Sequence, residues 1–109
     1  NQAESIEGDR ILVDFSKKAK ASLRGSDQLT RFGGDEFMAI LPDTDLEQAL
    51  LVANRFHEAG RQSQPIAWSV SIGISEWLDE DDSLDALLTR ADQALYKSKA
   101  LGRNRTHAA

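Results

Sequence analysis

The segment that most constrains the fold of this chain is a polar turn between two short apolar stretches. Gly33 and Gly34 lie in the turn, and glycine accepts the positive φ angles that tight hairpin turns require. The flanking apolar residues are Leu29, Phe32, Phe37, Ala39 and Leu41. Apolar stretches on both sides of a tight turn predict a β-hairpin, which we place at residues 27–41 and which Pro42 would close.

Two adjacent carboxylates, Asp35 and Glu36, follow the glycines. Without a Cβ, Gly33 and Gly34 would let a bulky anion approach the backbone. Carboxylate oxygens suit Mg²⁺ or Mn²⁺ held together with substrate phosphates. The four residues therefore suggest nucleotide chemistry. They are also ordinary turn residues whose polarity solvation alone explains, so the turn by itself leaves both interpretations open.

Composition limits the classes of protein to consider. The 109 residues suffice for one domain, and no apolar run among them reaches membrane-spanning length. There is no cysteine, which excludes disulfides and thiolate metal sites. A net charge of −5 argues against a general nucleic-acid-binding surface, whereas a free nucleotide needs only a local cluster of cations.

Hydrophobic periodicity predicts three helices and one further strand beside the hairpin. Residues 66–75 alternate between apolar side chains and small or polar ones, which is the clearest strand pattern in the sequence. Apolar residues at helical spacing place the helices at residues 9–24, 44–60 and 83–102. The order of a helix, a hairpin, a helix, a strand and a helix predicts an α+β fold with a helix-covered antiparallel sheet.

Several residues mark where these helices begin and end. A capping box at residues 44–47 would begin the second helix, and Gly60 would end it. Either Asp82 or Ser83 would cap the third helix. The acidic residues 76–82 before it are predicted to form a solvated connector.

Lys99 and Arg103 stand four residues apart near the end of the third helix, where they would share one face. A compact ammonium and a bidentate guanidinium together suit a triphosphate. Basic residues at a helix C-terminus are also favoured by the helix macrodipole alone, so the pair by itself leaves its role open.

The histidines and tryptophans carry weaker signals. His57 and His107 have no partner at metal-ligand spacing, and both are predicted to lie at the surface. Trp68 is expected in the core and Trp77 is expected to pack against its own loop.

Three segments at the expected distances resemble the GGDEF domain of diguanylate cyclases. Residues 31–37 read Arg-Phe-Gly-Gly-Asp-Glu-Phe, and residues 71–74 read Ser-Ile-Gly-Ile, similar to the family's S-[IV]-G-[IV] strand. Residues 91–104 resemble the family's last helix, AD-x-ALY-x-AK-x-x-GRN. The resemblance extends over residues 8–104 and implies a ferredoxin-like sheet of the nucleotidyl-cyclase type.

A fourth match is the RxxD site at which such enzymes bind their product, cyclic di-GMP. Arg24 and Asp27 have the required spacing, and Asp27 stands six positions before Gly33, as in the family. The resemblance therefore implies product inhibition through Arg24 and Asp27. A plain arginine at a helix end is the alternative for Arg24.

The resemblance implies an enzyme that condenses two GTP molecules into cyclic di-GMP and two pyrophosphates. Asp35 would coordinate a divalent ion, Mg²⁺ or Mn²⁺, and Glu36 would assist either that ion or the deprotonation of the attacking hydroxyl. The implied substrate-binding residues are Asp9 at the guanine edge, Gly33 and Gly34 at the backbone, and Lys99 and Arg103 at the phosphates. A second GGDEF domain would face the first in a homodimer, and an upstream sensor domain is expected. The supply of GTP implies a cytoplasmic location, which is compatible with a membrane-anchored parent protein.

The N-terminal segment departs from the family pattern. Gly8-Asp9 aligns, but Glu4 and Ser5 replace the usual Gly-His pair, and the asparagine that partners Asp9 would fall one position before Asn1. Asn1 would fill this role only after a deletion of one residue.

The strand that precedes this segment in the family, with the Asp that completes the metal site, is absent. We therefore expect residues 1–109 to be the C-terminal two-thirds of a GGDEF domain, with open strand edges and no activity alone. A separate segment, a disordered stretch or a truncation would each account for the difference.

Two further hypotheses remain beside the cyclase. A GGDEF domain without activity would serve as a receptor for cyclic di-GMP or GTP, which the altered Glu4-Ser5 pair favours. A ferredoxin-like interaction domain with an accidental motif would have to match the family at four segments by chance.

Overall fold

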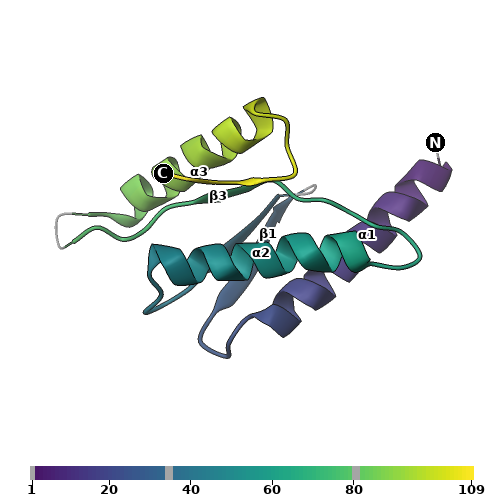
Figure 1. Ribbon diagram of the computed structural model, residues 1–109, viewed down its shortest axis with the longest axis horizontal. Helices are drawn as coiled ribbons and strands as arrows, with labels where there is room; N and C mark the ends of the chain where they lie inside the picture. Colours follow the sequence, from purple (N-terminus) through teal and green to yellow (C-terminus); the bar gives the residue numbers. More distant parts are fainter. Residues whose placement is uncertain (1, 34–35, 80–81) are drawn as a thin grey trace.

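The computed structural model describes residues 2–33, 36–79 and 82–109 (Figure 1). Within these residues three helices alternate with four short strands. The elements are α1 (Gln2–Ser22), β1 (Gln28–Gly33), β2 (Glu36–Ile40), α2 (Leu46–Gln62), β3 (Ile72–Ile74), α3 (Leu84–Ala100) and β4 (Thr106–Ala108). The predicted α+β class is confirmed, although the strands form two separate pairs rather than one sheet.

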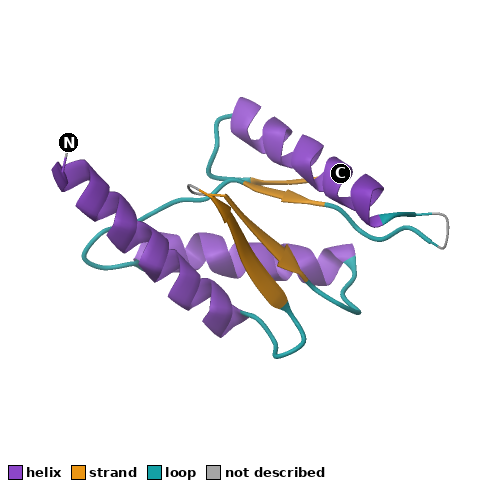
Figure 2. Cartoon of the chain, turned by 180° about the vertical axis from the view of Figure 1, so that it is seen from behind, coloured by secondary structure: helices purple, strands orange, loops and turns teal. Residues whose placement is uncertain are grey.

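The predicted hairpin is confirmed. Strands β1 and β2 pair in antiparallel register, with Gln28 opposite Ile40 and Arg31 opposite Phe37. The register shifts between Arg31 and Gly33, so that Gly33 lies opposite Glu36 at the turn end of the hairpin. In Figure 1 α2 crosses in front of the hairpin and in Figure 2 it lies behind, so α2 covers one face of these strands.

The core forms around Phe15 of α1. Its ring centroid lies 4.7 Å from that of Phe37 on β2, 5.3 Å from that of Trp68 and 6.0 Å from that of Phe56 on α2. Tilted and edge-to-face rings at these distances attract one another in addition to burying apolar surface. One aromatic side chain thereby joins the first two helices, the hairpin and the segment after α2, and the prediction of Trp68 in the core is confirmed.

A polar network beside this core ties α1 to the end of α2. Asp14 accepts hydrogen bonds from Trp68 Nε1 and from Ser63 Oγ, each at 2.7 Å, and it pairs with Lys18 at 3.2 Å. The hydrogen bonds from Trp68 and then from Ser63 hold the pKa of the Asp14 carboxyl below its usual value, because they stabilise its charged form. The network gives the buried Ser63 hydroxyl and the Trp68 indole N–H their partners.

Gly73 permits a very close contact between β3 and α3. A Cβ at this position would lie 2.3 Å from the carbonyl oxygen of Ala91 and 2.2 Å from the amide nitrogen of Leu95. No side chain fits at such distances, so only glycine allows the strand to lie directly on the helix backbone. The hydroxyl of Ser75 donates to the carbonyl of Leu87 at 2.6 Å and fixes the far end of the same contact.

The long strand predicted at residues 66–75 is wrong in its extent, because only Ile72–Ile74 forms a ladder. These residues pair in parallel with Thr106–Ala108, a strand that the sequence analysis did not predict. Strand β4 is three residues long, and the described residues offer residues 66–71 no other strand to pair with. Their alternation survives in burial, since Trp68 is buried between the exposed Ala67 and Ser69.

Helix boundaries also differ from the predictions. Helix α1 begins at Gln2 instead of Asp9, and the capping box of α2 joins Asp45 to Gln48, one residue later than predicted. Helix α2 continues through Gly60 to Gln62. A Cβ at Gly60 would lie 2.3 Å from the carbonyl oxygen of Trp68, so this glycine provides a packing contact instead of a helix end.

The start of α3 decides between the two predicted caps. Ser83 caps α3 by accepting from the amide of Ala86, while Asp82 accepts two hydrogen bonds from Arg90. Trp77 is half exposed. No helix among the described residues is long and apolar enough to cross a membrane.

The prediction that His57 lies at the surface is wrong. Its residue surface is 9% exposed, and its Nε2 lies 2.8 Å from the Thr106 hydroxyl on β4. Its Nδ1 is buried without a hydrogen-bond partner. Burial, and secondarily the charge of Arg61, lower the pKa of the His57 imidazole. His107 is half-buried within β4.

Replacing Gly73 tests the contact between β3 and α3. We expect Gly73→Ala to lower the free energy of unfolding by about 3 kcal/mol, because the new methyl group meets helix backbone that cannot move aside. Chemical denaturation measures the change. Gly25→Ala is the matched control, since no atom lies within 4 Å of a Cβ there, and a similar loss in both variants would contradict the argument.

Acidification tests the burial of His57. The folded state disfavours protonated His57, so the unfolded state binds more protons and stability falls as the pH drops below about 6.5. Denaturation curves at pH 7.5, 6.5 and 5.5 measure this dependence. We expect His57→Gln to flatten it over this range, and an unchanged slope in the variant would assign the pH dependence to other groups.

Candidate functional site

The hairpin turn places the predicted metal-binding residues at one end of β1 and β2. Gly33 is the last residue of β1 and Glu36 the first of β2, and the two are paired. Gly34 and Asp35 lie outside the described residues, as does the side chain of Glu36. The structure therefore supports the predicted backbone frame of this motif, while the roles of Asp35 and Glu36 remain predictions.

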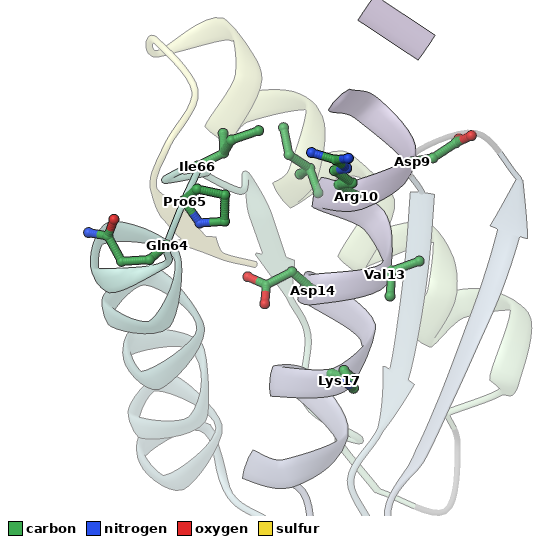
Figure 3. A pocket seen from close by; sticks show the side chains of 9 residues that line it. Asp9, Arg10, Val13, Asp14, Lys17, Gln64, Pro65 and Ile66 are labelled. Carbon is green, nitrogen blue, oxygen red and sulfur yellow. The ribbon is translucent and has the colours of Figure 1, made fainter. Parts of the chain in front are cut away.

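Asp9 lies on the exposed surface of α1, beside the hairpin. Figure 3 shows its side chain directed towards the strands, whereas Asp14 points to the opposite side of the helix, towards residues 64–66. A groove between α1 and the hairpin is lined by Asp9, Leu12, Val13, Ser16, Lys17, Lys20, Arg31 and Phe37. The predicted guanine-binding residue thus borders a groove whose apolar side chains suit an apolar or aromatic group and whose cations suit an anion.

Sequence analysis missed the cations of this groove. Lys17, Lys20 and Arg31 are not among the site residues expected from the sequence. All three line the same groove as Asp9. Their spacing on α1 was the available signal, because residues three apart on a helix lie on the same side.

Lys99 and Arg103 both lie at the C-terminal end of α3, but they do not share a helix face as predicted. The helix ends at Ala100, so Lys99 belongs to its last turn and Arg103 to the turn that follows. The backbone of Arg103 has a φ of 62°, in the left-handed region. Arg103 is exposed and Lys99 is half-buried.

Arg24 and Asp27 form a closed turn between α1 and β1. The amide of Arg24 donates to Asp27 Oδ2 at 2.8 Å, and its guanidinium Nη2 lies 3.5 Å from Asp27 Oδ1. The same Nη2 donates to the carbonyl of Pro42 and to the hydroxyl of Thr44. The side chain of Arg24 is 59% exposed and therefore open to a ligand, whereas that of Asp27 is 3% exposed.

The described residues contain no group of three or more His, Cys, Asp or Glu side chains that could hold a metal ion. The metal ligands predicted from sequence are at the hairpin turn, where Asp35 is outside the described part of the chain. The donor chemistry of Asp35 and Glu36 fits a hard divalent cation, because both supply carboxylate oxygens.

Comparison with known proteins shows which family the chain resembles. The family model described as "Diguanylate cyclase, GGDEF domain" matches residues 5–105. The response regulator PleD of Caulobacter vibrioides is 38% identical over 105 residues, which cover 89% of this chain and 23% of PleD. Diguanylate cyclase A of Treponema denticola is 35% identical over 104 residues, covering 90% of this chain and 28% of the cyclase. The chain thus spans about a quarter of the length of these relatives.

A solved structure shares the fold as well. The GGDEF domain of YfiN (TpbB) from Pseudomonas aeruginosa superposes with a TM-score of 0.84 at 30% sequence identity. The match covers 93% of this chain and 67% of the YfiN chain. Sequence, family model and fold agree over nearly all of the residues, and the chain belongs to the GGDEF domain family of diguanylate cyclases.

Proposed function

We propose that the chain is part of a diguanylate cyclase domain that condenses two GTP molecules into cyclic di-GMP. The 3′-hydroxyl oxygen of each GTP attacks the α-phosphorus of the other and forms a new P–O bond. The bond to the β-phosphate breaks, and pyrophosphate leaves with that electron pair. The single observation that carries the proposal is the intact Gly-Gly-Asp-Glu-Phe sequence at the turn of a hairpin in which Gly33 pairs with Glu36.

Each proposed residue contributes binding, orientation or proton transfer. Asp35 and Glu36 would hold a divalent ion, which when bound neutralises phosphate charge, and Glu36 would also take the proton of the attacking hydroxyl. Gly33 and Gly34 leave room for the phosphates beside the backbone. Asp9 would accept hydrogen bonds from the guanine edge. Lys99 and Arg103 would bind the phosphates, a role for which their common position at the C-terminal end of α3 suits them.

The reaction requires two nucleotides held in opposed orientations, and one domain binds one of them. We propose that the partner is a second GGDEF domain in a homodimer, so that each 3′-hydroxyl meets the α-phosphorus held by the other domain. Positioning of this kind supplies much of the acceleration in phosphoryl transfer, because the protein performs little covalent chemistry itself. An upstream sensor domain would control the encounter of the two domains.

Arg24 and Asp27 are proposed to bind the product and inhibit the enzyme. The exposed guanidinium of Arg24 suits a phosphate or a guanine edge, and Asp27 holds the turn in place through the Arg24 amide. In the unliganded chain this guanidinium is bound to Pro42 and Thr44. Binding of cyclic di-GMP would therefore exchange these contacts for contacts to the ligand.

A further strand is proposed between the two pairs of strands. The described part of the chain leaves residues 66–71 outside any ladder, and β2 pairs on one side only, with β1. A strand placed between β2 and residues 66–71 would satisfy both open edges and convert the two pairs into one sheet. The 109 residues would then be one portion of a larger GGDEF domain.

The second candidate is a GGDEF domain without cyclase activity that binds cyclic di-GMP or GTP as a receptor. The observation that favours it is the Glu4-Ser5 pair, which replaces the Gly-His of the family pattern close to Asp9. A receptor for cyclic di-GMP needs the Arg24 turn but not the carboxylates of the hairpin. Measuring synthesis and binding in the same protein distinguishes the two functions.

Replacing Asp35 tests the cyclase. In the full-length protein supplied with GTP and Mg²⁺, we expect synthesis of cyclic di-GMP that Asp35→Ala lowers at least about 100-fold. The variant loses a ligand of the divalent ion whose positive charge neutralises the reacting phosphates. Chromatography with mass detection measures the product. Glu47→Ala, which removes an exposed carboxylate on α2, is the control and should retain synthesis. A wild-type protein that binds cyclic di-GMP tightly but makes none would establish the receptor.

Replacing Arg24 tests product inhibition. We expect Arg24→Ala to weaken cyclic di-GMP binding by about 1.5–3 kcal/mol, the worth of a hydrogen bond from a charged group, and to relieve inhibition. Calorimetry measures the affinity. Thr44→Val is the matched control, because it removes an acceptor of the Arg24 guanidinium but keeps the arginine, and it should retain the affinity. Equal affinities in wild type and Arg24→Ala would exclude this site.

A further inference from the structure

The turn after α3 has an unusual backbone. Gly102, Arg103 and Asn104 have φ angles of 121°, 62° and 50°, so three successive residues lie in the left-handed region. Glycine adopts such angles readily, whereas arginine does so only when its surroundings enforce the conformation. The proposed phosphate-binding Arg103 is therefore held in a conformation that its own residue type disfavours.

Hydrogen bonds on successive residues hold this turn. The amide of Arg103 donates to the carbonyl of Ser98 at 3.0 Å, and the amide of Asn104 donates to the hydroxyl oxygen of Ser71 at 3.2 Å. The carbonyl of Arg105 accepts from the Ser98 hydroxyl at 2.6 Å and from the amide of Ile72 at 2.9 Å. The bond to Ser71 joins a left-handed residue of the turn to the segment that leads into β3.

Ser71 can reach the turn because of the close contact made by Gly73. The two residues belong to the Ser-Ile-Gly-Ile segment, and Gly73 lets this segment lie against the backbone of α3 at Ala91 and Leu95. The segment then runs alongside the last turns of α3, and Ser71 arrives beside Asn104. Two motifs far apart in the sequence, Ser-Ile-Gly-Ile and Gly-Arg-Asn, thus form one structural unit.

We propose that Ser71 is a positioning residue for Arg103, which it holds in its left-handed conformation through the amide of Asn104. The inference rests on the proposed phosphate-binding role of Arg103 and adds a residue to that site. Without the Ser71 hydroxyl, Asn104 can leave the left-handed region, since its amide is exposed and water replaces the lost partner. Arg103 then samples orientations in which its guanidinium no longer meets the phosphates, and affinity for the triphosphate falls.

The test measures binding of an α,β-methylene analogue of GTP, which cannot release pyrophosphate, to the full-length protein with Mg²⁺. We expect Ser71→Ala to raise the Kd about fivefold, the effect of one lost hydrogen bond, while the melting temperature changes little. Ser71→Thr retains the hydroxyl and should bind as the wild type does.

Ser98→Ala is the matched control, because it removes another serine hydroxyl bonded to the same turn. The carbonyl of Arg105 keeps its bond from Ile72 in this variant, so the Kd should change less than about twofold. An equal loss of affinity in Ser71→Ala and Ser98→Ala would overturn the specific role of Ser71.

The double variant Ser71→Ala/Arg103→Ala shows whether Ser71 acts through Arg103. A Kd equal to that of Arg103→Ala supports the proposal, and a further loss in the double variant overturns it. If Arg103→Ala raises the Kd and Ser71→Ala leaves it unchanged, this inference is overturned, while the phosphate-binding role of Arg103 stands. An unchanged Kd in Arg103→Ala would overturn the phosphate role of Arg103, and this inference with it.

Discussion

The packing of other aromatic rings around Phe15 is the interaction on which most of the described structure depends. Phe37, Phe56 and Trp68 come from β2, from α2 and from the segment after α2, and all three meet the same ring. A short chain has little apolar area to bury, so a few large rings must supply much of its hydrophobic stabilisation. The network centred on Asp14 lies beside these rings and fixes the position of Trp68 through its indole N–H.

In the second half of the molecule, β3 and α3 are joined by close backbone contact. Gly73 brings β3 onto α3, and Ser71 and Ser75 form hydrogen bonds on either side of it. This arrangement determines where α3 ends relative to the rest of the chain. The candidate phosphate-binding residues Lys99 and Arg103 take their position from it, as does β4, which returns to pair with β3.

Local signals predicted the hairpin and the helices well, and the exceptions have identifiable physical causes. Alternation in the predicted strand, residues 66–75, matches the burial of residues 66–70 only. A ladder also needs a neighbouring strand, and the described residues supply one only for residues 72–74. Gly60 resembled a helix end because the sequence does not show that the ring and carbonyl of Trp68 lie against it. His57 was assigned to the surface because its partner, Thr106, stands 49 positions away.

The sequence by itself determined the family and the candidate site residues, because the motif around Gly33 and the segments at residues 24–27, 71–74 and 91–104 are local patterns. It also determined the type of most elements through hydrophobic periodicity. The tertiary structure decided the position of Asp9 beside the cations Lys17, Lys20 and Arg31, and the left-handed conformation of Arg103. These features depend on contacts between residues far apart in the chain, such as Ser71 with Asn104, and such contacts form only when the packed elements bring their side chains and backbone together.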